Sequence, residues 1–138
     1  AIGIGQRRQV ELPSNRIQSA TLDALPLADE SVDAVICSAV LHFAHDIRDF
    51  TSMVQEMWRT LAPGGLFFAR LASSIGIEAL VAATVGRVRL PDGSDRFIVD
   101  EETLVRLTSD LGGVLSDPLK TTNVQNQRCM TTWVIEKP

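Results

Sequence analysis

The order of hydrophobic and polar residues predicts strands and helices that alternate along the chain. Residues 32–41 form an almost continuous apolar run, which favours a strand buried on both faces, although a buried helix also fits. Residues 46–61 carry apolar side chains at intervals of three and one, which is typical of a helix with one buried face. Asp46 is placed to cap this helix, and Pro63 is placed to end it.

The rest of the chain continues the alternation. A strand is predicted at residues 66–71, a short helix at 77–85 and a second long helix at 101–111. Two terminal strands are predicted at 114–124 and 129–136. Asp100 is placed to cap the second long helix. Weaker patterns indicate strands at residues 1–5 and 16–21, and residues 86–96 are expected to form a surface loop, with a lid as the alternative.

Alternating strands and helices predict an α/β fold with three layers, in which a mostly parallel sheet lies between helices. The two terminal strands require an antiparallel pair at the C-terminal end. The chain has 138 residues, so we expect a single domain over residues 1–138. Hydrophobic residues make up 45% and charged residues 22%, which is ordinary for a packed globular domain.

Composition and charge narrow the expected partners. The formal net charge is −4 and no basic stripe is present, so we expect no nucleic acid partner. No apolar run approaches the roughly 20 residues of a spanning helix and no signal-peptide pattern opens the chain, so we expect no membrane partner and a cytoplasmic protein. Cys37 and Cys129 lack metal spacing, which predicts free thiols and no metal site.

Three stretches in the first half of the chain form a recognisable series. They are LPLADESVDAV at 25–35, SAVLHF at 38–43 and EMWRTLAPGG at 56–65. In this order they resemble the LPFxDxSFDxV, SxxLHH and ExxRxLxPGG segments of the class I S-adenosylmethionine-dependent methyltransferases of type 11. The resemblance implies a Rossmann-like methyltransferase sheet, S-adenosylmethionine as cofactor and methyl transfer to a small-molecule acceptor.

The same resemblance implies six cofactor-binding positions: Gly3, Gly5, Thr21, Leu22, Ser38 and Ala39. Residues 1–5 are similar to the family's second strand, with Gly5 where an acid usually holds the ribose, so the usual first strand and first helix are lacking. Alternatively, Gly3 and Gly5 are remnants of the glycine-rich loop after the first strand. Thr21 and Leu22 align beside the adenine, and Ser38 is placed in the cofactor crevice or, alternatively, bonded to nearby backbone.

His42 follows the predicted buried strand at 32–41, at the edge where open α/β sheets bind ligands. Methyl transfer depends on proximity and orientation, often with a nearby base, and His42 is the candidate for that base. A purely structural histidine is the alternative.

Two further expectations follow from the missing strand. An open sheet edge invites pairing with another chain, which predicts a homodimer that closes the sheet. The alternative function is a non-catalytic methyltransferase-like relic that acts as a binding or assembly module, and a longer protein that lacks N-terminal residues here is a third possibility.

Overall fold

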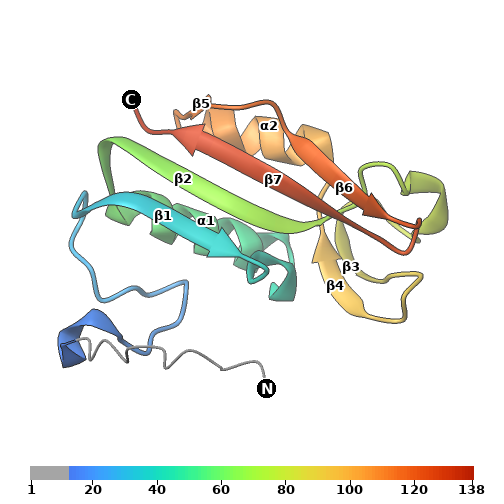
Figure 1. Ribbon diagram of the computed structural model, residues 1–138, viewed down its shortest axis with the longest axis horizontal. Coiled ribbons are helices and arrows are strands. Elements are labelled where there is room, and N and C mark those ends of the chain that lie inside the picture. The colour runs from blue at the N-terminus through green and yellow to red at the C-terminus, as the bar shows by residue number, and fades with distance from the viewer. Residues whose placement is uncertain (1–12) are drawn as a thin grey trace, which may run out of the picture.

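A long central strand, β2, organises the structure, which is a computed structural model that describes residues 13–138 (Figure 1). The main sheet consists of β1 (Val32–Ser38), β2 (Leu61–Ser73), β5 (Val114–Leu115), β6 (Lys120–Val124) and β7 (Arg128–Glu136). A separate two-stranded sheet consists of β3 (Gly86–Arg89) and β4 (Asp95–Ile98). The helices are α1 (Ile47–Thr60) and α2 (Glu101–Asp110), with short 3₁₀ turns η1 (Ser14–Arg16), η2 (Leu41–Phe43) and η3 (Glu78–Leu80).

Strand β2 pairs with β1 in parallel and with β7 in the antiparallel sense. Strands β5 and β6 pair with β7 near its two ends, also antiparallel. The α/β class and the C-terminal antiparallel strands are therefore confirmed. Within residues 13–138 the only parallel pair is β1 with β2, so the described sheet is mixed.

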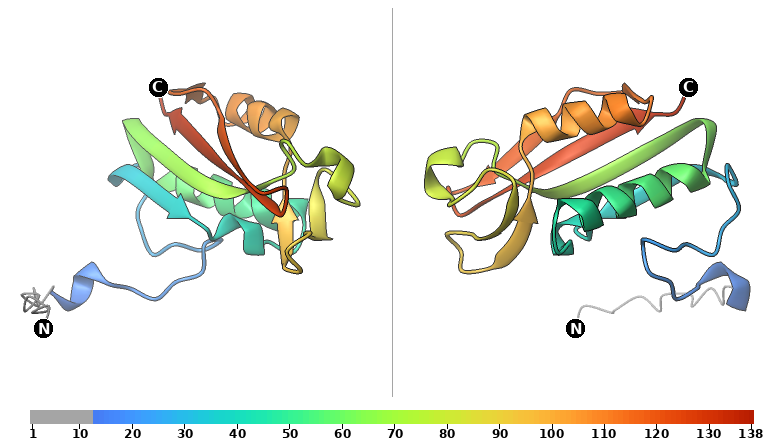
Figure 2. Two further views of the ribbon diagram at one scale, coloured as in Figure 1. Left: turned by 45° about the vertical axis from the view of Figure 1, so that its right-hand side comes forward. Right: turned by 180° about the vertical axis from the view of Figure 1, so that it is seen from behind.

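Both α-helices cover the same face of the sheet, as the view from behind shows (Figure 2). The main core lies between this face and the helices, where Phe50 and Val54 of α1 and Phe67 of β2 are fully buried. No described helix covers the opposite face, where Ile36 is 77% exposed. The described residues thus supply two of the three expected layers.

The predicted helix starts are confirmed in atomic detail. The side chain of Asp46 accepts a hydrogen bond from the backbone N–H of Asp49 at 2.8 Å, and that of Asp100 accepts one from Thr103 at 2.9 Å. Each bond satisfies an N–H that a helix leaves without a partner in its first turn. Both cysteines are free, as predicted, and the structure buries both of them.

Several predicted elements are wrong or shorter. The strand at 16–21 is absent: residue 16 ends η1, and Thr21 forms only an isolated bridge with Ala24. An extended segment becomes a strand only when a neighbouring strand pairs with it, and none of the described strands pairs with residues 16–21. The helix at 77–85 is reduced to the single turn η3, and residues 86–96 form the β3–β4 hairpin instead of a loop.

Two further strand predictions are right in position but differ in extent, since one strand ends earlier and the other is interrupted. Strand β1 stops at Ser38 because Ala39 adopts φ +60° and the chain then turns into η2. The strand expected at 114–124 is divided into β5 and β6 around Pro118, which has no N–H to donate to a ladder. The strand predicted at 1–5 lies outside the described residues.

Arg59 of α1 holds the segment that leads into β1. Its guanidinium donates to the carbonyl oxygen of Leu27 at 2.9 Å and to the carboxylate of Asp29 at 2.6 Å. Glu56 accepts from Arg59 at 2.7 Å and from the backbone N–H of Leu25 at 2.9 Å. The hydrogen bond from Arg59 is the main reason why the pKa of Glu56 is lowered to about 2. The first and third matched motifs are therefore in direct contact.

The free edge of β1 is the feature on which the homodimer expectation depends. Among the described strands, β1 pairs only with β2, so one of its edges carries no ladder. Dimerisation through this edge stays a prediction.

The first test concerns the link between β7 and α2. The buried indole of Trp133 donates to the hydroxyl of Thr108 at 2.9 Å, and that hydroxyl donates to the carbonyl of Leu104 at 2.8 Å. Thr108→Val keeps the shape but leaves the indole N–H without a partner, so we expect a loss of about 1–3 kcal/mol in the free energy of unfolding. Urea denaturation measures it.

Thr108→Ser is the matched control, because it keeps the hydroxyl and removes one methyl group. We expect this variant to retain most of the stability that Thr108→Val loses. Equal stability of the wild type and Thr108→Val would contradict the role given to this hydrogen bond.

Candidate functional site

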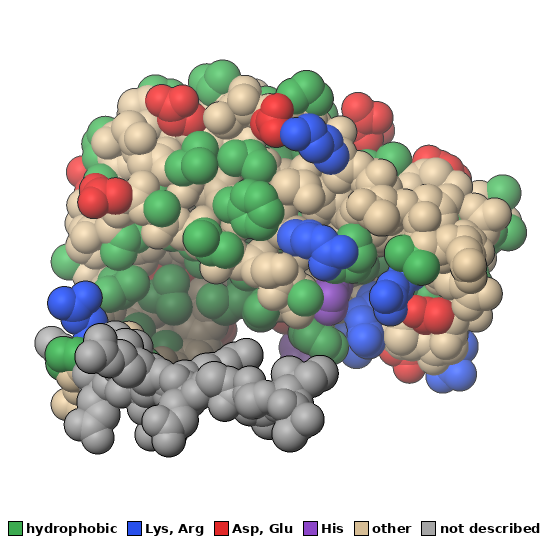
Figure 3. All heavy atoms as spheres, in the orientation of Figure 1, with side chains coloured by type: hydrophobic (Ala, Val, Ile, Leu, Met, Phe, Trp, Pro, Cys, Tyr) green, Lys and Arg blue, Asp and Glu red, His purple; other side chains and the backbone are tan. Residues whose placement is uncertain are grey.

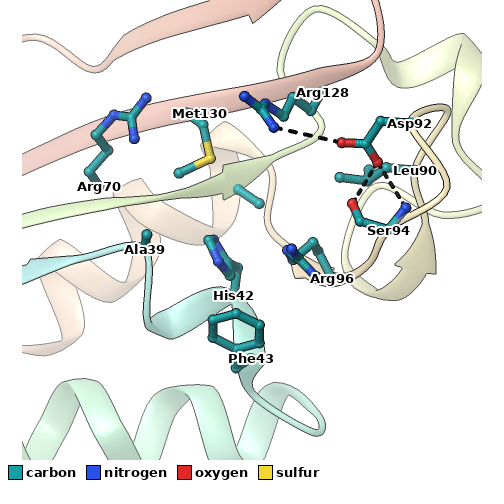
Figure 4. Close-up of a pocket in the computed structure, with 11 residues that line it drawn as sticks. Ala39, His42, Phe43, Arg70, Leu90, Asp92, Ser94, Arg96, Arg128 and Met130 are labelled. Atoms are coloured by element: carbon teal, nitrogen blue, oxygen red, sulfur yellow. Dashed lines mark hydrogen bonds and ion pairs between the residues drawn. The ribbon is translucent and has the colours of Figure 1, made fainter.

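A cavity of about 320 Å³ opens where the carboxyl ends of β1 and β2 meet the β3–β4 hairpin (Figure 4). Its volume is within the usual range for small-molecule sites. Five parts of the chain contribute its principal side chains, which are Ala39, His42, Arg70, Asp92, Arg96 and Arg128. Open α/β sheets bind ligands at this edge, so the position agrees with the expectation from sequence.

The backbone turn at Ala39 brings the chain from β1 into this cavity. Ala39 has φ +60°, the left-handed region that costs a residue with a Cβ roughly 1–2 kcal/mol. Its N–H donates to the carbonyl of Arg70 at 2.8 Å, which fixes the turn against β2. The turn leads directly into η2 and so places His42 at the cavity wall.

His42 is only 6% exposed, and its ring has an unusual environment. Within the described structure its Nδ1 is buried and has no hydrogen-bond partner. Phe43 packs edge-on against the imidazole, with 4.6 Å between ring centroids. Burial, and then the positive charges of Arg96 and Arg70, lower the pKa of His42 below its usual value. The imidazole is therefore neutral at neutral pH and keeps one nitrogen lone pair, as a general base requires.

The β3–β4 hairpin forms the opposite wall and is attached to η2. Arg87 donates to the carbonyl of Ala44 at 3.0 Å, and the guanidinium of Arg96 lies 5.0 Å from the centre of the Phe43 ring. Asp92, in the hairpin turn, accepts from both the N–H and the hydroxyl of Ser94. These contacts make the hairpin a fixed part of the cavity.

The cavity is electropositive in an acidic chain. Among the described residues, Arg70, Arg96 and Arg128 line it together with a single carboxylate, that of Asp92. No local sequence pattern predicts this cluster, because the three arginines are far apart along the chain. Strand β2, the hairpin and strand β7 bring them to one place (Figure 4).

A second hollow, of about 400 Å³, follows the free edge of β1. Leu22, Val35, Ser38 and Met57 are among its lining residues, and none of those residues is charged. The space-filling view shows apolar side chains around this part of the molecule (Figure 3). It is a mostly apolar groove, unlike the cavity beside His42.

The four predicted cofactor residues that the structure describes are divided among the groove, the cavity and an isolated bridge. Leu22 and Ser38 line the groove along β1, whereas Ala39 lines the cavity beside His42. Thr21 is in the isolated bridge with Ala24. The two glycines, Gly3 and Gly5, lie outside the described residues. The binding roles of all six, and the role of His42 as a base, stay predictions.

Comparison with known proteins confirms the resemblance found in the sequence. Residues 4–69 match the family described as a methyltransferase domain. A comparison with curated proteins finds no significant match.

Solved methyltransferase structures share the fold at low sequence identity. A SAM-dependent methyltransferase from Methanosarcina mazei superposes with a TM-score of 0.66 at 17% identity, over 86% of this chain and 65% of its own. A Burkholderia thailandensis 1,6-didemethyltoxoflavin-N1-methyltransferase, bound to 1,6-didemethyltoxoflavin and S-adenosylhomocysteine, gives 0.64 at 13% identity, over 86% and 48%. The N-methyltransferase NodS from Bradyrhizobium japonicum, with S-adenosylhomocysteine, gives 0.58 at 15% identity, over 86% and 52%. The chain spans less than two thirds of each of these proteins.

The described residues do not fit the nucleoside part of S-adenosylmethionine. Ribose hydroxyls are held best by a carboxylate, through charge-assisted hydrogen bonds. Among residues 13–138, no carboxylate lines the groove along β1.

Residues 13–138 contain neither a metal-binding cluster nor a membrane-spanning helix. No group of three or more His, Cys, Asp or Glu side chains in this range is arranged to hold a metal ion. None of the described helices is long and apolar enough to cross a membrane.

The lowered pKa of His42 makes the stability of the protein depend on pH. Because the native pKa lies below the ordinary value of 6.5, the unfolded state binds more protons as the pH falls through 6.5. The contribution of the neutral His42 to the free energy of unfolding is present above that pH and is lost below it. For each pH unit over which only the unfolded state is protonated, the free energy of unfolding falls by about 1.4 kcal/mol.

We expect His42→Gln to reduce the fall in unfolding free energy between about pH 7 and pH 5, as measured by urea denaturation. His45→Gln is the matched control, since His45 is an exposed histidine three residues away. Parallel pH profiles for the wild type and His42→Gln would contradict the neutral, buried state of His42.

Proposed function

We propose that this chain takes part in methyl transfer from S-adenosylmethionine to a small-molecule acceptor, and that the acceptor occupies the cavity beside His42. The observation that carries the proposal is His42 itself. It is a buried, uncharged imidazole with an unpartnered nitrogen, and it lines a cavity at the carboxyl end of the sheet. It also lies within the part of the chain that matches the methyltransferase domain.

In this proposal His42 acts on the acceptor. The cofactor, when bound, supplies an electrophilic methyl group on its sulfonium sulfur. His42 would accept the proton of an acceptor O–H or N–H that contacts the imidazole, which would leave the acceptor oxygen or nitrogen more nucleophilic toward that methyl group. Arg70 and Arg96 oppose a positive charge on the imidazole, so the proton passes readily to solvent afterwards.

The second candidate function is a non-catalytic methyltransferase-like binding module. The observation that favours it is that none of the described residues lining the groove along β1 carries a carboxylate. The two candidates differ in whether the chain binds the cofactor.

Calorimetric titration with S-adenosylhomocysteine, using this chain at its own length, separates the two candidates. For the proposed function we expect saturable binding with a Kd in the micromolar range, about −8 kcal/mol. No binding up to millimolar ligand, by a protein whose circular dichroism shows it to be folded, would overturn methyl transfer for this chain and favour the binding module.

His42→Gln tests the role of the base. With any acceptor that the wild type methylates, we expect kcat to fall about 10²–10⁴-fold, because the proton acceptor is removed. The affinity for S-adenosylhomocysteine should stay the same, and His45→Gln should leave kcat unchanged. A kcat unaffected by His42→Gln would remove His42 from the reaction.

A further inference from the structure

The cavity beside His42 combines positive charge with an apolar surface. Arg70, Arg96 and Arg128 line it, and Asp92 offsets one of their three charges. Phe43, together with Leu90 and Met130, supplies the apolar part. A cavity of this kind suits a small organic anion that has an apolar body.

The three guanidinium groups have few fixed partners. Within the described part of the chain, no hydrogen bond or ion pair is made by the guanidinium of Arg70. Arg128 is 4.0 Å from the carboxylate of Asp92, too long for a hydrogen bond. Arg96 donates only to the carbonyl of its neighbour Asp95, at 2.8 Å, and packs on the Phe43 ring. Most of their N–H donors are therefore free to bind a ligand.

Charge-assisted hydrogen bonds from arginine suit carboxylate and phosphate groups, because the planar guanidinium presents paired donors. The net charge of the chain is −4, so general electrostatics do not attract an anion to it. The local excess of positive charge is a property of this cavity. After burial, the positive charges of Arg96 and Arg70 are the next causes of the lowered pKa of His42, so an anion held by these two arginines lies close to the imidazole.

We infer that the cavity recognises a carboxylate or phosphate group on the methyl acceptor, through Arg70, Arg96 and Arg128, while Phe43, Leu90 and Met130 contact an apolar body. This inference rests on the proposed function for the identification of the ligand as the acceptor. The carboxylate of the cofactor's own amino acid part has the same chemistry, so the test must separate the two sources.

The test is an NMR titration of the ¹⁵N-labelled wild-type chain without cofactor. The probes are benzoate and phenyl phosphate, with benzamide as a neutral analogue and benzylamine as a cationic one. We expect saturable shifts at the backbone amides of Ala39, Phe43 and Ser94 with the two anions only. Raising the salt concentration from about 0.05 M to 0.5 M should weaken this binding.

Substitution of the exposed arginines identifies the groups responsible. We expect Arg70→Gln and Arg128→Gln each to weaken phenyl phosphate binding at least about fivefold. Arg106→Gln is the matched control, because it removes the same charge from the exposed surface of α2. Retained dispersion of the NMR spectrum shows that each variant is folded.

Two cofactor fragments separate the sources of the anion. S-adenosylhomocysteine carries an amino acid part with its carboxylate, and 5′-methylthioadenosine has a methyl group on sulfur in place of that amino acid part. If the arginine substitutions weaken S-adenosylhomocysteine binding but not methylthioadenosine binding, the arginines serve the cofactor, and the inference is overturned. Equal binding of benzamide and benzoate, or no effect of either arginine substitution on the anions, also overturns it.

This test and the test of the proposed function can fail separately. Anion binding is measured without cofactor or turnover, so its failure leaves methyl transfer standing with a neutral acceptor. If the chain binds the anions but not S-adenosylhomocysteine, the result would instead indicate a binding module for small organic anions.

Discussion

The pairing register of β2 is the constraint on which the rest of the structure depends. Successive residues of a strand point to opposite faces, so Phe67, Ala69 and Leu71 enter the core while Arg70 points away from it. The register places Arg70 beside Ser38 of β1 on one side and Thr132 of β7 on the other. A register slip of one residue would turn Arg70 into the core and expose the side chains of Phe67, Ala69 and Leu71 to solvent. Burial of the core therefore also fixes the position of the cavity.

The motifs that made the chain recognisable mainly hold the fold together. Glu56 and Arg59 belong to one motif, and the segment at 25–29 that they bind belongs to another. These contacts explain why the two motifs occur together, since the helix and the segment before β1 need each other. These contacts supply no group for methyl transfer. The motifs that carry the resemblance therefore indicate the fold, and evidence for function has to come from the cavity.

Elements with local signals could be predicted from the sequence, and those that depend on distant partners could not. The caps Asp46 and Asp100 satisfy backbone groups only three residues away, and apolar spacing identified both helices. The four-residue strands of the hairpin are too short for a periodic pattern, and the segment at 16–21 has the pattern of a strand but pairs with none of the described strands. The arginine cluster exists only because the sheet register and the hairpin bring three separate elements together.

The hairpin has a consequence for how related chains can diverge. Strands β3 and β4 pair with each other along their lengths and contribute no strand to the main sheet. Their attachment to η2 is through side chains, chiefly Arg87 and Arg96. Insertions, deletions or exchanges at the turn around Asp92 can therefore alter one wall of the cavity while the ladder of β2 is preserved. The hairpin turn is thus a replaceable part of the cavity wall, and evolution or protein engineering can exchange it to change the ligand preference while the main sheet stays the same.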